Sequence, residues 1–171
     1  LALLGACLSV GLGCQAPEER RVQYDERFER TKMDVYLPGG DATDRPAILT
    51  VHGGAWTYFD NRSYRYVARR FARSGYVVAN MNYRLVPDGV FPNSVHDVAC
   101  ALAYMQNHAD ELGIDPTRIA IMGYSAGAHL ATLVAVATDV TSGMGPAPER
   151  AVLSSDTRAL TRRIAARHPG R

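Results

Sequence analysis

The stretch RIAIMGYSAGAHLATLVAVAT (residues 118–138) indicates how this chain folds and where it could carry out chemistry. RIAIMG is a short apolar run typical of a buried strand, and AGAHLATLVAVAT is apolar almost all round, as expected for a central helix. Ser125 stands between them, so the chain must fold back sharply there. Gly123 and Gly127 leave the room that such a turn requires. The stretch therefore predicts a strand, a strained turn at Ser125 and a helix.

A serine on such a turn is lifted above the carboxyl end of its strand, where its Oγ can attack a substrate. The turn also directs the backbone N–H of Ala126 towards the point where a substrate oxyanion would form, and the following helix adds its positive end. Gly-x-Ser-x-Gly by itself is a common pattern, but its place between a buried strand and an apolar helix makes it specific. We predict that Ser125 is a catalytic nucleophile; the alternative is a glycine-rich turn with an inert serine.

The stretch PAILTVHGGAW (residues 46–56) predicts a second buried strand followed by an irregular loop. Acyl transfer needs two or more N–H donors aimed at the developing charge. Gly53 and Gly54 permit a backbone that turns N–H groups into a site, so we expect an oxyanion hole here. His52 is expected to bond the loop backbone rather than to act in catalysis, and Trp56 to be either core packing or a pocket wall.

Predicted strands and helices alternate along the chain, which implies a parallel sheet with right-handed crossovers and helices on both faces. Ligands of such sheets bind outside the carboxyl ends of the strands, where HGGAW and GYSAG both fall. The second predicted helix opens with Ser94 and Asp97 as a candidate capping pair. The other predicted elements are the strands KMDVYLP (32–38), YVVANMNY (76–83) and RAVLSS (150–155) and helices within residues 64–75 and 92–112.

The motifs VHGGAW, GYVVANMNYRL, FPNSVHDVACALAYM and GIDPTRIAIMGYSAGAHLA follow one another within residues 32–139. In them the chain resembles α/β-hydrolase carboxylesterases of the feruloyl and acetyl esterase-like and hormone-sensitive lipase-like groups. The resemblance implies a mostly parallel sheet, a small-molecule ester substrate, and the N–H groups of Gly54, Ala55 and Ala126 as oxyanion donors. Ala55 replaces the third glycine of the lipase-like HGGG motif, a position that kynurenine formamidase-like relatives also vary, so the substrate class stays open. Asp97 matches a family aspartate expected to cap the helix or make a buried bond.

The partners that would activate Ser125 are not assigned. Family members take an acid and then a histidine from loops after later strands. Asp156 follows the sixth predicted strand, one strand before the usual acid, and His168 has no predicted strand before it. His129 lies one helical turn after Ser125, but its direction is along the helix. We therefore treat the triad acid and histidine as unknown.

The arginine-rich tail DTRALTRRIAARHPGR (residues 156–171) does not resemble the family. We expect residues 31–171 to form a partial α/β-hydrolase domain that lacks its carboxyl-terminal strands and is inactive as it stands. The alternative is a non-catalytic, lipid-anchored hydrolase-like protein or a gene fragment. A further strand followed by Asp or Glu, and another followed by His, would distinguish an esterase from these alternatives.

The first residues, LALLGACLSVGLGC (1–14), resemble the apolar region and cleavage site of a secretory signal peptide. Cys7 and Cys14 each close a motif similar to the lipobox of bacterial lipoproteins. Cys14 is preferred, because the apolar run ends there and a polar segment begins. We expect export to the cell envelope or periplasm, a lipid anchor on Cys14 and a polar tether over residues 15–30; an ordinary signal peptide is the alternative.

Other ligand classes have little support in the sequence. The net charge of +2 comes without a basic stripe interleaved with aromatic residues, so nucleic acid is not expected as a partner. The third cysteine, Cys100, falls in a predicted helix and is expected to be a small buried side chain. Neither a CxxC pair nor an HExxH motif occurs, so we expect no metal and no cofactor.

Overall fold

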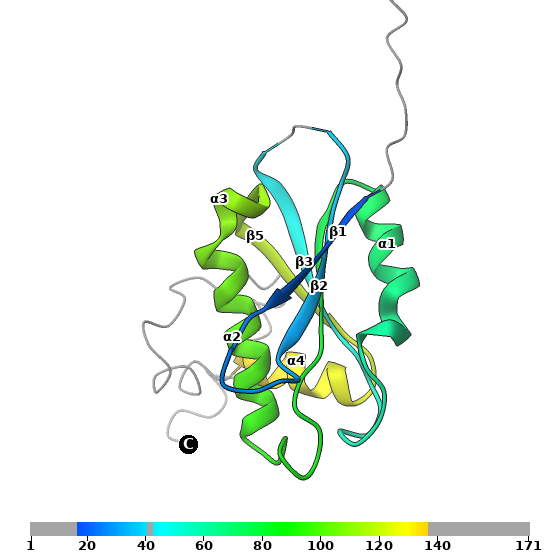
Figure 1. Cartoon of the computed structure of the whole chain (residues 1–171), viewed down its shortest axis with the longest axis vertical. Coiled ribbons are helices and arrows are strands. Elements are labelled where there is room, and N and C mark those ends of the chain that lie inside the picture. Colours follow the sequence, from blue (N-terminus) through cyan, green and yellow to red (C-terminus); the bar gives the residue numbers. More distant parts are fainter. Residues whose placement is uncertain (1–16, 41–42, 137–171) are drawn as a thin grey trace, which may run out of the picture.

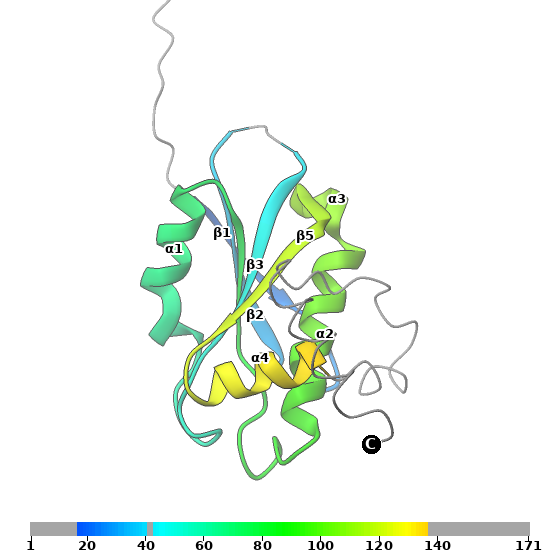
Figure 2. The ribbon, with the colours of Figure 1, turned by 180° about the vertical axis from the view of Figure 1, so that it is seen from behind.

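A mixed sheet of five strands lies between helices in the computed structural model, which describes residues 17–40 and 43–136 (Figures 1 and 2). The strand order is β1-β2-β4-β3-β5. β3 runs parallel to both β4 and β5, whereas β2 is antiparallel to both β1 and β4. The strands are β1 (Glu18–Gln23), β2 (Lys32–Leu37), β3 (Arg45–Val51), β4 (Val77–Met81) and β5 (Ile114–Gly123).

Helices cover both faces of the sheet, as the sequence predicted, and Figure 1 shows α1 on one side with α2 and α3 on the other. α1 buries Ala68 and Ala72 against Ile48 and Val78 in the smaller cluster of the core. The larger cluster packs side chains of α2, α3 and α4 against the opposite face of the sheet. The helices are α1 (Arg65–Arg73), α2 (Asn93–Asn107), α3 (Ala109–Leu112) and α4 (Ala126–Val136), with a 3-10 helix, η1 (Asn61–Tyr64), before α1.

The amino-terminal segment differs from the expected tether, because Glu18–Gln23 pair with β2 along their whole length. The charged side chains conceal this strand in the sequence, but charges are common on edge strands, where they discourage pairing with other molecules. Arg21 Nε donates to the buried Asp34 carboxylate at 2.9 Å, which ties β1 to β2. Residues 18–23 therefore belong to the folded domain.

The start of α2 also differs from the expectation. The helix begins after Pro92 without a side-chain cap. Asp97 does not pair with Ser94; its carboxylate accepts hydrogen bonds from the backbone and the guanidinium of Arg84. The prediction that Ser94 and Asp97 form a capping pair is therefore wrong, and the alternative prediction, that Asp97 makes a buried bond, is confirmed. The predicted helix within residues 92–112 is divided at His108 into α2 and α3.

Several sequence predictions lie outside the described residues. They concern the strand at 150–155 and the residues Cys7, Cys14, Asp156 and His168. Within residues 17–40 and 43–136, every helix is too short or too polar to cross a bilayer.

The register of the parallel strands brings three loops to one edge of the sheet. Val51, the last residue of β3, lies opposite Met81 of β4 and Gly123 of β5. The chain segments that follow these residues therefore leave the sheet side by side. They contain the HGG motif, the NYR tripeptide and Ser125, so the predicted meeting of HGGAW and GYSAG at the carboxyl ends of the strands is confirmed.

Candidate active site

Ser125 occupies the strained turn that the sequence predicted. Its φ of 53° lies in the left-handed region, which few residues other than glycine adopt. The turn is closed by hydrogen bonds from Gly127 N–H to the Tyr124 carbonyl at 2.9 Å and from His129 N–H to the Ser125 carbonyl at 3.1 Å. Ser125 is exposed at this edge of the sheet. Such strain is retained where the surrounding structure demands it, and often at functional sites.

The glycines of this elbow (residues 123–127) are required by close backbone contacts. A Cβ on Gly123 would lie 2.3 Å from the carbonyl carbon of Gly127. A Cβ on Gly127 would lie 2.1 Å from the carbonyl oxygen of Val51, at the end of β3. The amino end of α4 therefore rests directly on β3, and only hydrogen fits between the two backbones.

The oxyanion loop (residues 52–60), as we name the segment after β3, lies against the elbow. A Cβ on Gly53 would be 2.9 Å from the Tyr124 carbonyl oxygen and 3.4 Å from Ser125 Cβ. Gly54 has a φ of 113°, and Ala55 and Trp56 follow with φ of 48° and 60°. The Gly54 carbonyl accepts hydrogen bonds from the N–H groups of residues 57 and 58 at 3.0 and 2.9 Å, which close the turn. The structure thus brings the predicted donor loop and the predicted nucleophile together.

His52 is fully buried and bonds the loop backbone, as predicted. Its Nδ1–H donates to the Gly53 carbonyl at 2.7 Å, and burial lowers the pKa of its ring. The ring stacks on Tyr83, with 4.3 Å between the centroids. Tyr83 in turn donates its hydroxyl proton to the His52 carbonyl at 3.0 Å. Sequence reasoning did not single out Tyr83; its place directly after the buried β4 strand is the signal that could have found it.

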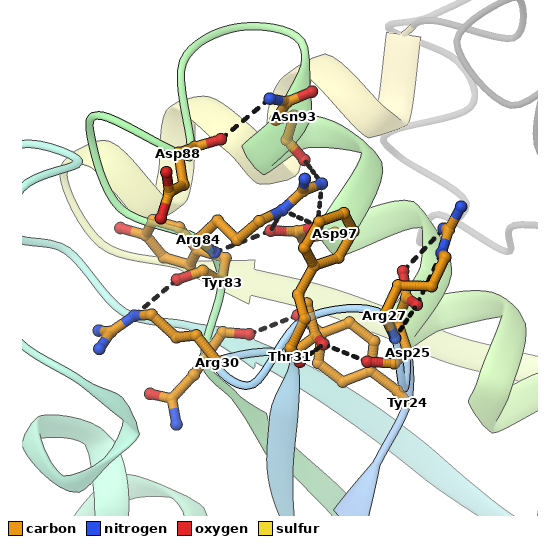
Figure 3. Close-up of polar contacts among 12 residues, drawn as sticks. Tyr24, Asp25, Arg27, Arg30, Thr31, Tyr83, Arg84, Asp88, Asn93 and Asp97 are labelled. Carbon is orange, nitrogen blue, oxygen red and sulfur yellow. Dashed lines mark hydrogen bonds and ion pairs between the residues drawn. The ribbon is translucent and has the colours of Figure 1, made fainter.

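The segment around Tyr83 is held by charged groups, which Figure 3 shows. Arg30 Nε donates to the Tyr83 carbonyl at 2.8 Å, and another nitrogen of Arg30 donates to the carbonyl of Phe59 in the oxyanion loop. Arg84 forms a buried ion pair with Asp97 at 2.6 Å, and its guanidinium lies over the Phe28 ring at 3.8 Å. The turn between β1 and β2 therefore supports the loops at the site.

Trp56 and His129 form the side of the site towards α4. Their rings meet edge to face at 5.4 Å, and Trp56 is 38% exposed, which fits the wall of a pocket better than the core. His129 is thereby engaged with Trp56, and no side chain of residues 17–40 or 43–136 makes a hydrogen bond to Ser125 Oγ. Within the described residues, therefore, no hydrogen bond links His129 to Ser125 Oγ.

An apolar rim surrounds this edge of the sheet. Its aromatic residues come from all three loops that leave the parallel strands, and each is about two-thirds exposed; they are Tyr58, Phe59, Phe91 and Tyr124. The same described residues contain no group of three or more His, Cys, Asp or Glu placed to hold a metal ion.

The family model described as BD-FAE matches residues 33–161. Carboxylesterase NlhH of Mycobacterium tuberculosis is 35% identical over 125 residues, which are 72% of this chain and 39% of that protein. A bacterial heroin esterase superposes with a TM-score of 0.68 at 33% identity, covering 81% of this chain and 44% of the esterase. The α/β-hydrolase enzyme MGS-M1 from a deep-sea metagenome superposes with a TM-score of 0.64 at 28% identity, covering 71% and 52%. The chain thus spans less than two thirds of each relative, and the likeness confirms the esterase resemblance and the α/β-hydrolase fold.

Proposed function

The chain belongs to the BD-FAE family, and on this premise we propose that its site hydrolyses carboxylic esters through an acyl intermediate on Ser125. One observation carries the proposal: the loop expected to donate N–H groups lies against the elbow that presents the serine, so closely that a Cβ on Gly53 would lie 2.9 Å from the Tyr124 carbonyl oxygen and 3.4 Å from Ser125 Cβ. Two segments far apart in the sequence therefore meet in the arrangement that acyl transfer needs.

In the proposed reaction, Ser125 Oγ attacks the ester carbonyl carbon while a base takes the hydroxyl proton. The carbonyl oxygen becomes an oxyanion, which would accept hydrogen bonds from the N–H groups of Gly54, Ala55 and Ala126, with Gly53 shaping the loop. The ester C–O bond then breaks, and the alkoxide leaves as the alcohol with the proton from the base. In a second step the base takes a proton from water, which attacks the acyl carbon; the bond to Ser125 Oγ breaks, the proton returns to Oγ and the carboxylic acid leaves. The amino end of α4 adds a favourable dipole at the oxyanion.

The base is proposed to come from outside the described residues. Histidines at positions 52 and 129 are both engaged elsewhere, one on the Gly53 carbonyl and the other on Trp56. His168 lies in the chain beyond residue 136, but nothing in the described geometry favours it. A histidine from outside residues 17–40 and 43–136, oriented by a carboxylate, would supply the missing proton transfer.

The main test compares Ser125→Ala with the unaltered enzyme in hydrolysis of p-nitrophenyl acetate. Loss of the nucleophile should lower kcat by roughly 10⁴-fold or more. Ser63→Ala is a matched control, because its hydroxyl only donates to the Asp60 carbonyl at 2.6 Å at the start of η1. Full activity of the Ser125 variant would refute the assignment.

A second candidate function is a non-catalytic hydrolase-like protein. It is favoured by the lack of any hydrogen bond to Ser125 Oγ within residues 17–40 and 43–136. A fluorophosphonate probe separates the two candidates, because only an activated serine reacts with it. Labelling that Ser125→Ala abolishes would exclude the second candidate, whereas an unlabelled chain that also hydrolyses no ester would establish it.

We also propose export and a lipid anchor on Cys14, which rest on the sequence alone. β1 begins at Glu18, so only four residue steps separate the anchor from the sheet. Such a linker spans at most about 14 Å, which would hold the domain close to the membrane surface. Mass spectrometry of the membrane fraction would show a lipidated Cys14 at the mature terminus; an unmodified terminus would contradict the proposal.

A further inference from the structure

We propose that Tyr83 is a positioning residue of the oxyanion loop, whose buried hydroxyl fixes the direction in which Gly54 presents its N–H group. The role assigned to that N–H group rests on the proposed esterase function. Tyr83 is fully buried and lies directly after β4, on a different segment from both the nucleophile and the loop.

The contacts converge on two consecutive peptide units. The Tyr83 hydroxyl lies 3.0 Å from the His52 carbonyl oxygen and 3.4 Å from the Gly53 carbonyl oxygen. The Gly53 oxygen also accepts from His52 Nδ1 at 2.7 Å, and the His52 ring is stacked on Tyr83. Tyr83 therefore contacts the carbonyls of both His52 and Gly53. It also packs against the His52 ring, which itself bonds the Gly53 carbonyl.

Peptide planarity transmits this support to the site. In a trans peptide the carbonyl of one residue and the N–H of the next lie in one plane and point in opposite directions. Because the Gly53 carbonyl is held inwards by His52 Nδ1 at 2.7 Å and, more weakly, by the Tyr83 hydroxyl at 3.4 Å, the Gly54 N–H must point away from the buried side. The Gly54 carbonyl is fixed by the N–H groups of Thr57 and Tyr58, which orients the Ala55 N–H in the same way.

Tyr83 can act as a support because its own backbone is held at consecutive residues. The Asn82 carbonyl accepts from the Tyr24 hydroxyl at 2.6 Å, and the Tyr83 carbonyl accepts from Arg30 at 2.8 Å. The Arg84 N–H donates to Asp97 at 2.7 Å. These groups come from the β1–β2 turn and from α2, and Figure 3 shows them gathered around the segment.

The hydroxyl remains a donor over the working pH range, because burial raises the pKa of Tyr83 to about 12. Truncation of this hydroxyl should therefore release the loop without removing the aromatic ring that packs on His52. Tyr83→Phe makes that change. Tyr36→Phe is the matched control, because it removes the hydroxyl of another buried tyrosine, which packs with α1 on the opposite face of the sheet and not against the loop.

The primary test is the ¹⁵N relaxation order parameter of residues 53–55 in each variant of the 171-residue chain. We expect values near 0.85 in the unaltered chain and in Tyr36→Phe, and values below about 0.6 in Tyr83→Phe. Unchanged order parameters in Tyr83→Phe, or an equal loss in Tyr36→Phe, would overturn the proposal. This readout does not depend on whether the chain hydrolyses esters.

Kinetics with p-nitrophenyl acetate then connect the loop to chemistry. Tyr83→Phe should lower kcat about tenfold or more and leave KM within about twofold, because the oxyanion forms only in the transition state. A loosened loop with unchanged kcat would refute the role in catalysis, while full activity of Ser125→Ala would refute the proposed function and leave the loop result intact.

A measurement on the unaltered chain covers the case in which Tyr83→Phe does not fold. The Tyr83 hydroxyl proton should exchange slowly enough with water to give its own NMR signal, because the group is buried and hydrogen-bonded. A Tyr83 hydroxyl that exchanges as fast as that of the exposed Tyr66 would contradict the proposal.

Discussion

The elbow (residues 123–127) and the platform segment (residues 82–84) both shape the surroundings of Ser125, but they are built in different ways. The elbow depends on close backbone contacts, in which no atom larger than hydrogen fits at Gly123 or Gly127. The platform segment depends on side chains from distant parts of the sequence, among them Tyr24, Arg30 and Asp97. One region is fixed by steric exclusion and the other by hydrogen bonds and charge.

This difference predicts different responses to mutation. A steric clash between backbones cannot be relieved by a side-chain rotation, so substitution in the elbow should be close to all or none. Each hydrogen bond of the platform contributes about 1 kcal/mol, and a buried charge without a partner costs more. Damage to the platform should therefore be graded, and it should affect the precision of the site before it affects the fold.

The largest effect is expected for Gly127→Ala. The new Cβ would lie 2.1 Å from the Val51 carbonyl oxygen and 2.5 Å from that of His52. We expect a loss of at least about 3 kcal/mol in the free energy of unfolding, or no soluble folded protein. Gly75→Ala is the control for backbone strain without crowding, because its φ of 94° is unfavourable for alanine, whereas the φ of Gly127 is not positive, and nothing lies within 4 Å of the new atom. Similar urea midpoints for the two variants would show that crowding is not what fixes the elbow.

The next effect is expected for Asp97→Ala, which removes the acceptor of the Arg84 N–H and the carboxylate that pairs with the guanidinium, leaving the guanidinium its bond to the Asn93 carbonyl. Removal of one partner from a buried ion pair costs about 3–5 kcal/mol. A cost of about 3 kcal/mol, the lower end of that range, should reduce Tm by roughly 6–12 °C for a chain of this size. Asp97→Asn keeps an acceptor for the N–H and should lose less. Equal decreases in Tm for the two variants, measured by calorimetry, would mean that the negative charge of Asp97 contributes nothing to stability.

A smaller effect, dependent on pH, is expected from His52. Burial lowers the pKa of its ring in the folded chain below the ordinary value of 6.5, so the unfolded chain binds a proton first as the pH falls. The free energy of unfolding should therefore be unaffected by this group above 6.5 and should decrease as the pH falls below that value. Urea titrations across this range should show the decrease in the unaltered chain and in His96→Gln, and a weaker one in His52→Gln. If the free energy of unfolding depended on pH in the same way in His52→Gln and His96→Gln, burial of His52 would not be the cause of the decrease.

Much of the fold and the local parts of the site follow from the sequence, because their causes lie within a few residues. Apolar runs give the buried strands, and the two glycines around Ser125 give the elbow. Tyr83 was missed because a tyrosine after a buried strand looks like ordinary core until its hydroxyl is placed beside the His52 carbonyl. β1 was missed for a related reason, since its charges suit an edge strand as well as a tether.

Asp97 shows the limit of local patterns. Its spacing from Ser94 fits a capping box, yet the structure uses its carboxylate for Arg84, thirteen residues away in the sequence. The Asp97 carboxylate could accept hydrogen bonds either from the start of the helix or from Arg84. In the structure it accepts them from the Arg84 N–H and guanidinium. Such contacts depend on the strand order of the sheet, which spacing in the sequence does not reveal.

The smallest effect is expected at the end of the sheet opposite the site, where Asp115 lies near the start of β5. Hydrogen bonds from Thr117 and then from Arg118 lower the pKa of its carboxyl to about 2. This group therefore favours the folded state above its ordinary pKa of 3.8, and the contribution is lost as the pH falls from 3.8 to about 2. Water screens the exposed Asp115–Arg118 pair, so Asp115→Ala at neutral pH should lower Tm by less than about 2 °C and leave kcat unchanged. Asp115 and Asp97 both bond an arginine and a main-chain N–H, so burial is the main difference between them. If Asp115→Ala lowered Tm as far as Asp97→Ala, burial could not be the reason why the Asp97–Arg84 ion pair contributes more to stability than the Asp115–Arg118 pair.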